Sequence, residues 1–263
     1  MVISIHLSLA IYCRFDILVI SRKEVFVMSY VTELVHQKLT LGRHVQIKLL
    51  GDSITHGVGG SGFEMDGEVI TCGVRRNPNG YCWAKIFKEY MENKYDCTVI
   101  NNGIGGITIE FIIEHFAELV DEGDDLIICT IGTNNRHQYH VDGPQRTYEQ
   151  HTKRFYDLIF RLHGMLKAAG KDFIFVANIP ASASDEVDGP TYWRIMHMDD
   201  INDLYKKAWL DLQFPFISLY DLFTAYCQTN DRTVDSLLID GLHPNDEGYD
   251  VMYRLLTDAL GVV

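Results

Sequence analysis

Five short apolar runs recur along the chain from residue 45 onward. They are rich in β-branched and aromatic residues, and their apolar positions are mostly continuous rather than alternating. Continuous apolar runs of this length are typical of strands that are buried on both faces of a parallel sheet. The pattern therefore predicts five strands, at 45–50, 97–101, 126–131, 173–177 and 216–219.

Segments with helical periodicity separate these runs. Apolar residues spaced three and four positions apart mark five amphipathic helices. Their stripes cover 83–91, 109–120, 155–166, 204–212 and 249–260. Strands that alternate with helices imply right-handed crossovers and helices on both faces of the sheet, so the sequence predicts a three-layer α/β/α domain. Two long irregular stretches, 56–80 and 179–199, are expected to be loops.

The N-terminal segment does not fit this alternating pattern. Its apolar run, 2–13, is followed by charged residues, and it is too short and too interrupted for a membrane span of about 20 residues. It also lacks the basic start and the small-residue cleavage site of a secretory signal. We therefore expect residues 1–27 to be an extension outside the core fold and 28–263 to form a single domain. Met28 is then the expected physiological start.

Charge and cysteine content limit the possible partners and compartment. The 263 residues include 23 Lys and Arg against 36 Asp and Glu, which gives a formal net charge of −13. Nucleic acid and anionic membranes would repel such a chain, so neither is an expected partner. Six cysteines without a C-x-x-C pair indicate a reduced, cytoplasmic protein, although a bridge between Cys72 and Cys82 stays open. The sequence does not indicate an oligomeric state.

Polar motifs follow the first three predicted strands and precede the last helix. They are 51–55 (GDSIT), 101–108 (NNGIGGIT), 132–135 (GTNN) and 240–244 (DGLHP). In open parallel sheets, functional groups gather at the carboxyl ends of the strands. We therefore expect these four segments to meet in one site.

Together these segments hold the groups that acyl transfer needs. A serine hydroxyl is a poor nucleophile until a base takes its proton, and Ser53 and His243 are the candidates for these two roles. Asp240, three residues before His243, would fix the tautomer of the imidazole. The amides of Ser53 and Gly106 and the side chain of Asn134 would hold the oxyanion, because the Gly106 amide has no Cβ in its way.

The four motifs closely resemble those of the SGNH (GDSL-like) esterases and lipases, over roughly residues 45–262. The resemblance implies a flavodoxin-like five-stranded parallel sheet and catalysis without a metal or organic cofactor. It also implies a nucleophile, oxyanion donors and a proton relay at matching positions. These positions are Ser53, Gly106, Asn134, Asp240 and His243.

This chain departs from the family pattern in two motifs. The third motif usually ends in Asp, but here it ends in Asn135, and Ile107 stands where relatives often have Asp. The usual Asp of the third motif is not the residue that relays protons. We therefore expect Asn135 to change loop hydrogen bonding more than catalysis.

Several of these residues also have simpler interpretations. Ser53 could be only a helix N-cap, and the glycines of 103–106 could form a phosphate-binding turn. No Walker lysine follows in 57–62, which argues against nucleotide binding. His137 and His140 suggest a metal pair, but without further ligands at metal-site spacing a solvated loop is the favoured interpretation, and no metal site is predicted.

Substrate contacts are less clearly indicated. Arg75 and Arg76 could grip an anionic or sugar substrate, although solvent exposure is the default for both. Tyr192 and Trp193 could wall an acyl or sugar pocket or could only pack a loop.

The sequence predicts a serine esterase acting on a small-molecule ester through an acyl-enzyme. The absence of a long apolar lid segment favours a short acyl group, such as the acetyl of an O-acetylated sugar. A lysophospholipase or a thioesterase is the main enzymatic alternative. A non-catalytic binding module on the same fold is a further alternative, but binding alone does not need a base beside a nucleophile.

Overall fold

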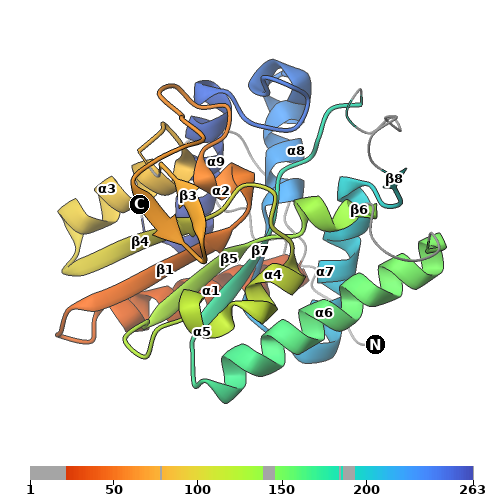
Figure 1. Cartoon of the computed structure of the whole chain (residues 1–263). Coiled ribbons are helices and arrows are strands. Elements are labelled where there is room, and N and C mark those ends of the chain that lie inside the picture. The colour runs from red at the N-terminus through yellow and green to blue at the C-terminus, as the bar shows by residue number, and fades with distance from the viewer. Residues whose placement is uncertain (1–21, 78, 139–145, 184, 186–192, 263) are drawn as a thin grey trace, which may run out of the picture.

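Five strands form one parallel sheet in the order β4-β1-β5-β7-β9 (Figure 1). The structure, a computed structural model, describes residues 22–77, 79–138, 146–183, 185 and 193–262. The strands of the sheet are β1 (Val45–Gly51), β4 (Cys97–Gly103), β5 (Leu126–Thr130), β7 (Phe173–Ala177) and β9 (Phe216–Ser218). This order is that of a flavodoxin-like sheet. All five strands predicted from the sequence are confirmed, with boundaries that agree to within two residues.

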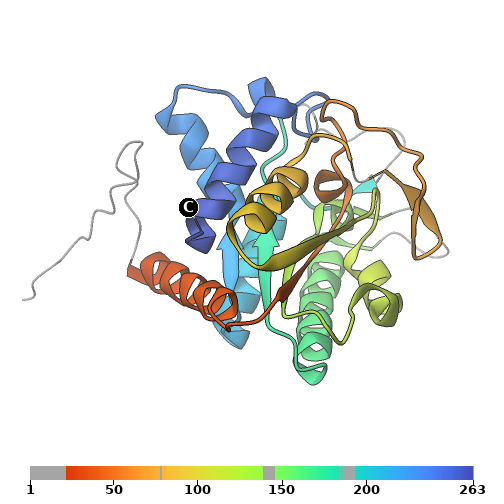
Figure 2. The same ribbon diagram turned by 90° about the vertical axis from the view of Figure 1, so that its left-hand side faces the viewer.

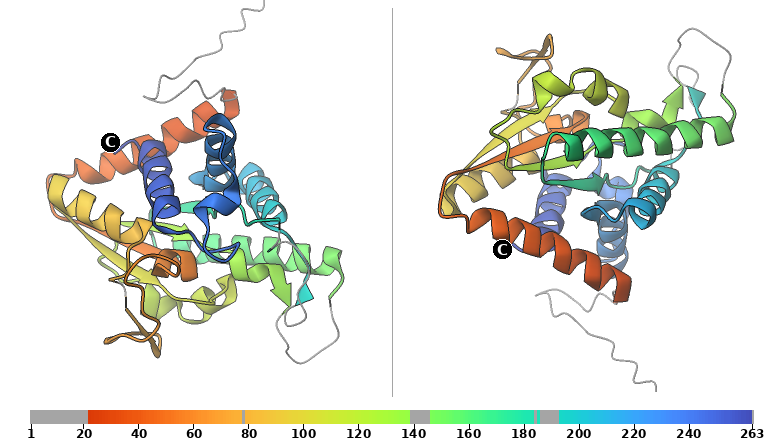
Figure 3. Two further views of the ribbon diagram at one scale, coloured as in Figure 1. Left: turned by 90° about the horizontal axis from the view of Figure 1, so that it is seen from above. Right: turned by 90° about the horizontal axis from the view of Figure 1, so that it is seen from below.

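Helices cover both faces of the sheet (Figure 3). One face packs against α1 (Arg22–Leu39), α3 (Trp83–Lys94), α8 (Leu219–Thr229) and α9 (Asp246–Leu260). The other face packs against α4 (Ile109–Glu114), α5 (Phe116–Leu119), α6 (Tyr148–Ala168) and α7 (Met198–Leu212). Successive residues of β5 enter opposite layers, since Leu126 and Ile128 pack on the first face and Ile127 and Cys129 on the second. Burial on both faces explains why the strands are continuously apolar.

The helices differ from the prediction in two ways. The stripe 109–120 is two short helices rather than one, because the backbone of His115 leaves the helical region between them. Helices α1 and α8 were not predicted. Helix α1 crosses the expected boundary at residue 28 and lies beside α9 (Figure 2), where the Thr32 hydroxyl donates to the Ala259 carbonyl. Residues 1–21 lie outside the described part, so the division into extension and domain stays a prediction.

The expected loop 56–80 contains a β-hairpin. Short elements of the structure are α2 (Ser53–His56), β2 (Val69–Thr71), β3 (Val74–Arg76), η1 (Thr133–Arg136), β6 (His137–Gln138), β8 (Trp193–Arg194) and η2 (Val234–Leu237). Strands β2 and β3 form the hairpin, with positive φ at both turn residues, Cys72 and Gly73. Arg75 on β3 is exposed, whereas Arg76 is buried at 3% exposure. The expectation that Arg76 faces solvent is therefore wrong: its guanidinium donates to Thr71 Oγ1 and Asn102 Oδ1.

The described cysteines are unpaired. Cys72 and Cys82 are both free thiols, so the bridge that the sequence left open between them is not formed. Within the described residues, no helix combines the length and apolar character needed to cross a bilayer.

The end of β4 packs without space against α2. A Cβ added at Gly103 would lie 2.5 Å from the His56 nitrogen and 2.6 Å from the Thr55 carbonyl carbon. Both are backbone atoms, which cannot move aside as the end of a flexible side chain can. Glycine at 103 therefore allows the first two polar motifs to approach each other.

Replacing Gly103 should destabilise the protein. We expect Gly103→Ala to lower the free energy of unfolding by about 1–3 kcal/mol, because the added methyl group must displace backbone. Gly164→Ala on α6 is the matched control: an added Cβ there meets no atom within 4 Å, and alanine favours a helix interior by roughly 0.5–1 kcal/mol. Urea unfolding of both variants tests this. A Gly103→Ala protein as stable as the wild type would contradict the packing described.

His56 is buried beneath the hairpin as a neutral imidazole. It is 1% exposed and its ring meets that of Phe63 edge-on at 5.1 Å. Burial and the nearby Arg76 guanidinium lower its pKa from 6.5 to about 4. Between these two values the unfolded chain binds a proton that the folded chain does not. The free energy of unfolding therefore falls as the pH decreases from 6.5 toward 4.

Removing this histidine should flatten the pH dependence of stability. We expect the free energy of unfolding of His56→Gln to fall less steeply with decreasing pH than that of the wild type. The two slopes should differ by up to about 1.4 kcal/mol per pH unit, the value for one proton. Burial also lowers the pKa of His137 to about 4. His137 therefore contributes to the pH dependence of stability in both proteins. Urea unfolding at several pH values between 7 and 4.5 measures the difference, with Gly164→Ala as a non-titrating control. Equal slopes in His56→Gln and the wild type would show that His56 does not stay neutral.

Candidate active site

Ser53 lies in the sharp turn from β1 into α2. Asp52, not Ser53, is the N-cap of α2: its carboxylate accepts from the Ile54 N–H at 3.1 Å. The interpretation of Ser53 as an N-cap is therefore wrong. Ser53 is the first residue of the helix and is 7% exposed, at the carboxyl edge of the sheet. Its backbone N–H belongs to the first helical turn, where amides have no partner within the helix.

His243 approaches Ser53 from the other end of the chain. The His243 Nε2 atom is 2.8 Å from Ser53 Oγ, although the two residues are 190 positions apart in sequence. The other ring nitrogen, Nδ1, is 2.7 Å from Asp240 Oδ2. An ionised carboxylate only accepts hydrogen bonds, so Nδ1 carries the proton and Nε2 of the neutral ring accepts from the serine hydroxyl.

Asp240 is held in place by the same turn that carries His243. Its Oδ1 accepts from the backbone N–H groups of Leu242 and His243 at 3.0 and 2.8 Å. Burial would raise the pKa of Asp240, but the hydrogen bonds from the His243 backbone and ring outweigh it, so this pKa lies below the usual value. Asp240 is therefore ionised at neutral pH and can stabilise a protonated His243.

Backbone contacts fix the Asp240–His243 turn on the protein. Gly241 has a φ of +86°, which L side chains rarely adopt. The Ile239 N–H donates to the His243 carbonyl at 2.9 Å, and the Gly241 carbonyl accepts from the Ser182 N–H at 2.8 Å. The turn leads into α9, whose N-cap is Asn245. The histidine and its carboxylate thus come from one short, well-anchored segment.

The predicted oxyanion donors lie on neighbouring loops. Gly106 is exposed in the turn after β4 with a φ of +79°, and an added Cβ would meet nothing within 4 Å. The positive φ, rather than close approach past a missing Cβ, is therefore the reason for glycine here. Asn134 on η1 is 9% exposed, and its Nδ2 donates to the Ile107 carbonyl at 2.9 Å. This bond ties the Gly106 turn to the third motif.

Asn135, the departure from the family pattern, makes bonds that an aspartate could not all make. Its Oδ1 accepts from the Ile109 N–H at 3.0 Å, and its Nδ2 donates to Glu110 Oε2 at 2.7 Å. A carboxylate here would repel Glu110. The expected change in loop hydrogen bonding is thus located at the start of α4, and its effect on catalysis stays a prediction.

Sequence reasoning missed a buried polar network behind Ser53. Asp52 is fully buried, and its Oδ2 accepts from Asn178 Nδ2 at 3.1 Å, while the same amide donates to Thr133 Oγ1 at 2.8 Å. Burial raises the pKa of Asp52, and hydrogen bonding with Thr133 and the Ile54 N–H opposes the rise. Asn178 directly follows β7, so its place at a strand end was the one signal that could have revealed it.

Among the candidate substrate residues, the structure describes the side chains of Arg75 and Arg76, whose role in substrate binding stays a prediction. Arg75 is exposed on the hairpin, and Arg76 is buried against Thr71 and Asn102. The side chain of Trp193, and all of Tyr192 and His140, lie outside the described residues. The substrate role of Trp193 and the metal pair of His137 with His140 therefore stay untested.

Comparison with known proteins identifies the family and the fold. The sequence profile of the GDSL-like lipase/acylhydrolase family matches residues 49–251. No curated protein matches the chain. Among solved structures, the acetylxylan esterase Axe2 from Geobacillus stearothermophilus is similar with a TM-score of 0.60 and 18% identity, over 85% of this chain and 96% of Axe2. LAE5, an α/β hydrolase enzyme from the metagenome of Lake Arreo, Spain, is similar with a TM-score of 0.59 and 19% identity, over 85% of this chain and 98% of LAE5.

At these identities the structural matches establish the fold, and the profile match over most of the chain establishes the family. The profile spans the first three polar motifs and the Asp240–His243 turn. The chain therefore belongs to the GDSL-like lipase/acylhydrolase family, whose members are carboxylic ester hydrolases.

Proposed function

We propose that this protein is a serine esterase that removes short acyl groups, such as acetyl, from hydroxyl groups through an acyl-enzyme. The observation that carries the proposal is the unbroken chain of hydrogen bonds from Asp240 through His243 to Ser53. Catalytic mutants of Axe2 replace a serine, an aspartate and a histidine, the last two separated by three positions as here. That agreement in residue type and spacing supports the assignment of the three roles.

Acylation begins with attack of Ser53 Oγ on the carbonyl carbon of the ester. His243 Nε2 takes the hydroxyl proton as the new C–O bond forms, and Asp240 stabilises the imidazolium that results. The carbonyl oxygen becomes an oxyanion, which is held by the backbone N–H groups of Ser53 and Gly106 and by the side-chain amide of Asn134. His243 then passes its proton to the leaving alcohol oxygen as that C–O bond breaks, and an acyl group remains on Ser53.

Deacylation repeats these steps with water as the nucleophile. His243 takes a proton from water, the hydroxide attacks the acyl carbon, and Ser53 leaves with the proton returned by His243. His243 and Asp240 have the same roles in both halves of the reaction. Ser53 is the nucleophile in acylation and the leaving group in deacylation. The described groups therefore account for the whole cycle with the ester and water as the two reactants.

The preference for a short acyl group rests on two lines of support. The chain has no long apolar segment between its elements that could serve as a lid over a bulky acyl chain. Axe2, a structural neighbour, is an acetylxylan esterase. A sugar is the natural alcohol for this proposal, and longer-chain esters and thioesters are the competing substrates.

Removing the nucleophile or the base should abolish most of the activity. We expect Ser53→Ala to lose turnover of p-nitrophenyl acetate, and His243→Ala to fall at least about 10²-fold, the usual contribution of a general base. The rates are measured at saturating substrate so that they report the chemical steps.

Ser61→Ala is the matched control. Ser61 is an exposed serine, and its hydroxyl donates to the Asp246 carboxylate at 2.5 Å rather than to an imidazole. We expect its rate to stay close to that of the wild type. A His243→Ala enzyme with nearly normal turnover would remove His243 from the mechanism.

Acyl-chain length tests the proposed substrate class separately. We expect kcat/KM for p-nitrophenyl esters to fall steeply from acetate to octanoate, because a pocket shaped for two carbons excludes longer chains. Equal or reversed rates would leave the esterase assignment intact and reject the short-acyl proposal.

A further inference from the structure

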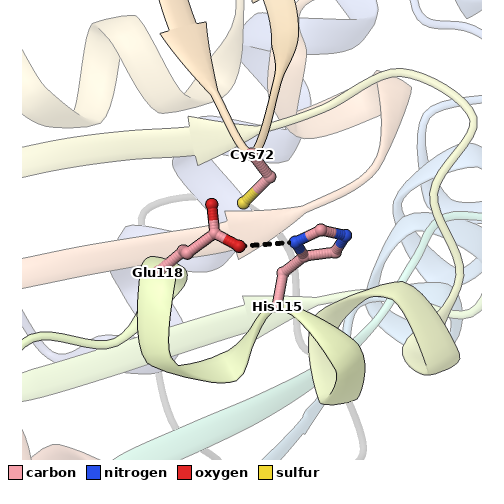
Figure 4. Close-up of side chains that lie close together, drawn as sticks. All are labelled: Cys72, His115 and Glu118. Atoms are coloured by element: carbon pink, nitrogen blue, oxygen red, sulfur yellow. Dashed lines mark hydrogen bonds and ion pairs between the residues drawn. The ribbon is translucent and has the colours of Figure 1, made fainter.

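A second cluster of chemically active side chains lies away from Ser53. Figure 4 shows Cys72, His115 and Glu118 pointing toward one another from two separate parts of the chain. One ligand atom from each, a thiol sulfur, a ring nitrogen and a carboxylate oxygen, all lie within 4.8 Å of one another. Cys72 and His115 are half-buried and Glu118 is exposed, so the cluster can be reached from solvent.

The backbone determines this convergence. Cys72 is at the turn of the β2–β3 hairpin with a φ of +48°, which aims its side chain down at the helices (Figure 4). His115 occupies the break between α4 and α5, and Glu118 follows three residues later on the same face. The His115 Nδ1 atom is 2.8 Å from Glu118 Oε1, and the Phe111 ring lies 4.3 Å from the imidazole and restricts its orientation.

We propose that Cys72, His115 and Glu118 form a binding site for a zinc ion, with water as the fourth ligand. Thiolate, imidazole and carboxylate are the three kinds of side chain that bind Zn²⁺ in proteins, and three protein ligands with one open position make a known tetrahedral arrangement. Softer metals prefer more sulfur, and Ca²⁺ and Mg²⁺ prefer oxygen alone, so the mixed set favours zinc.

The distances need only a small adjustment for zinc. With metal–ligand bonds of about 2.0–2.3 Å, tetrahedral ligand atoms lie roughly 3.3–3.6 Å apart. The nitrogen and oxygen now in hydrogen-bond contact would therefore separate by about half an ångström, while the thiol would move inward. Because Glu118 is on the surface, rotation of its side chain can provide the first change without disturbing the core.

The local charges also suit a cation. Burial and the neighbouring Glu118 carboxylate raise the pKa of Cys72, and the more distant Arg76 opposes this. A thiol in such surroundings is a poor free nucleophile. When Zn²⁺ binds, Cys72 loses its proton, and the ion lies between the resulting thiolate and the Glu118 carboxylate, which would otherwise repel each other.

Zinc at this position would link the β2–β3 hairpin to α4 and α5, the helices that follow the turn at Gly106. The hairpin is already held at its other end, where Arg76 donates to Asn102. Helix α4 begins at Ile109, three residues after Gly106. The inferred role of the ion is therefore to stabilise the structure beside the active site, and it does not depend on the proposed catalytic function.

Metal binding by the whole chain tests the inference. Untagged protein is stripped with a chelator, and Zn²⁺ affinity is measured by competition with a chromophoric chelator. Co²⁺ is then used as a spectroscopic replacement. We expect one Zn²⁺ per chain, and a near-ultraviolet thiolate-to-cobalt absorption that is lost in Cys72→Ala. His115→Ala and Glu118→Gln should each lower the Zn²⁺ affinity at least about tenfold, since even changes around metal ligands have effects of that size.

Two variants control for thiols and histidines elsewhere. Cys227→Ala removes a buried free thiol, and His44→Ala removes an exposed histidine that pairs with Asp96 at 2.7 Å. Both should bind Zn²⁺ as the wild type does, and circular dichroism shows whether every variant is folded. Failure of the folded wild-type chain to bind stoichiometric Zn²⁺, or a cobalt–thiolate absorption that persists in Cys72→Ala, would overturn the proposal. Neither result would bear on the esterase assignment.

Discussion

The hydrogen bond between His243 Nε2 and Ser53 Oγ is the contact on which the account of this protein depends. It joins residues that are 190 positions apart. Helix α9 packs on the same face of the sheet as α3, and its Tyr249 hydroxyl donates to the Val58 carbonyl, which holds the turn before α9 beside the end of β1. A serine at a strand end is a poor nucleophile without a base, and a histidine before a helix is not a catalyst without a hydroxyl to deprotonate. Held 2.8 Å apart with Asp240 behind the ring, they form a path for a proton.

The protein maintains this contact by rigid packing on both sides of it. On the serine side, Asp52 caps α2 and is held by Asn178, and the absence of a side chain at Gly103 lets β4 lie against the helix backbone. On the histidine side, the turn is hydrogen-bonded to Ser182 and ends in a capped helix. A site that keeps its geometry before substrate arrives does not have to reorganise during the reaction.

Much of this could be read from the sequence because the relevant signals are local. The strands were visible because a strand buried on both faces is apolar at nearly every position, as 126–129 is. Asp240 and His243 were identifiable together because both stand on one short turn. Ser53 and Gly106 were identifiable because each lies in a polar motif just after a strand.

What the sequence did not reveal depends on contacts between distant segments. The charge of Arg76 suggested solvent, yet Asn102 accepts its hydrogen bond in the interior. Asn178 gave no signal that it would meet Asp52. Cys72 stands 43 positions before His115, and only the hairpin brings the two together. Helix α1 begins in a segment that seemed separate from the fold, and its later residues Val31 and Val35 pack in the same core cluster as α9.

Peptide mapping after reaction with a fluorophosphonate tests the central claim most directly. Such a reagent is attacked only by a serine whose proton is removed as it reacts, so the adduct marks the activated hydroxyl. We expect one adduct per chain, on the peptide that contains Ser53, and its loss when His243 is replaced by alanine. An adduct on another serine, or equal labelling of Ser53 without His243, would contradict it.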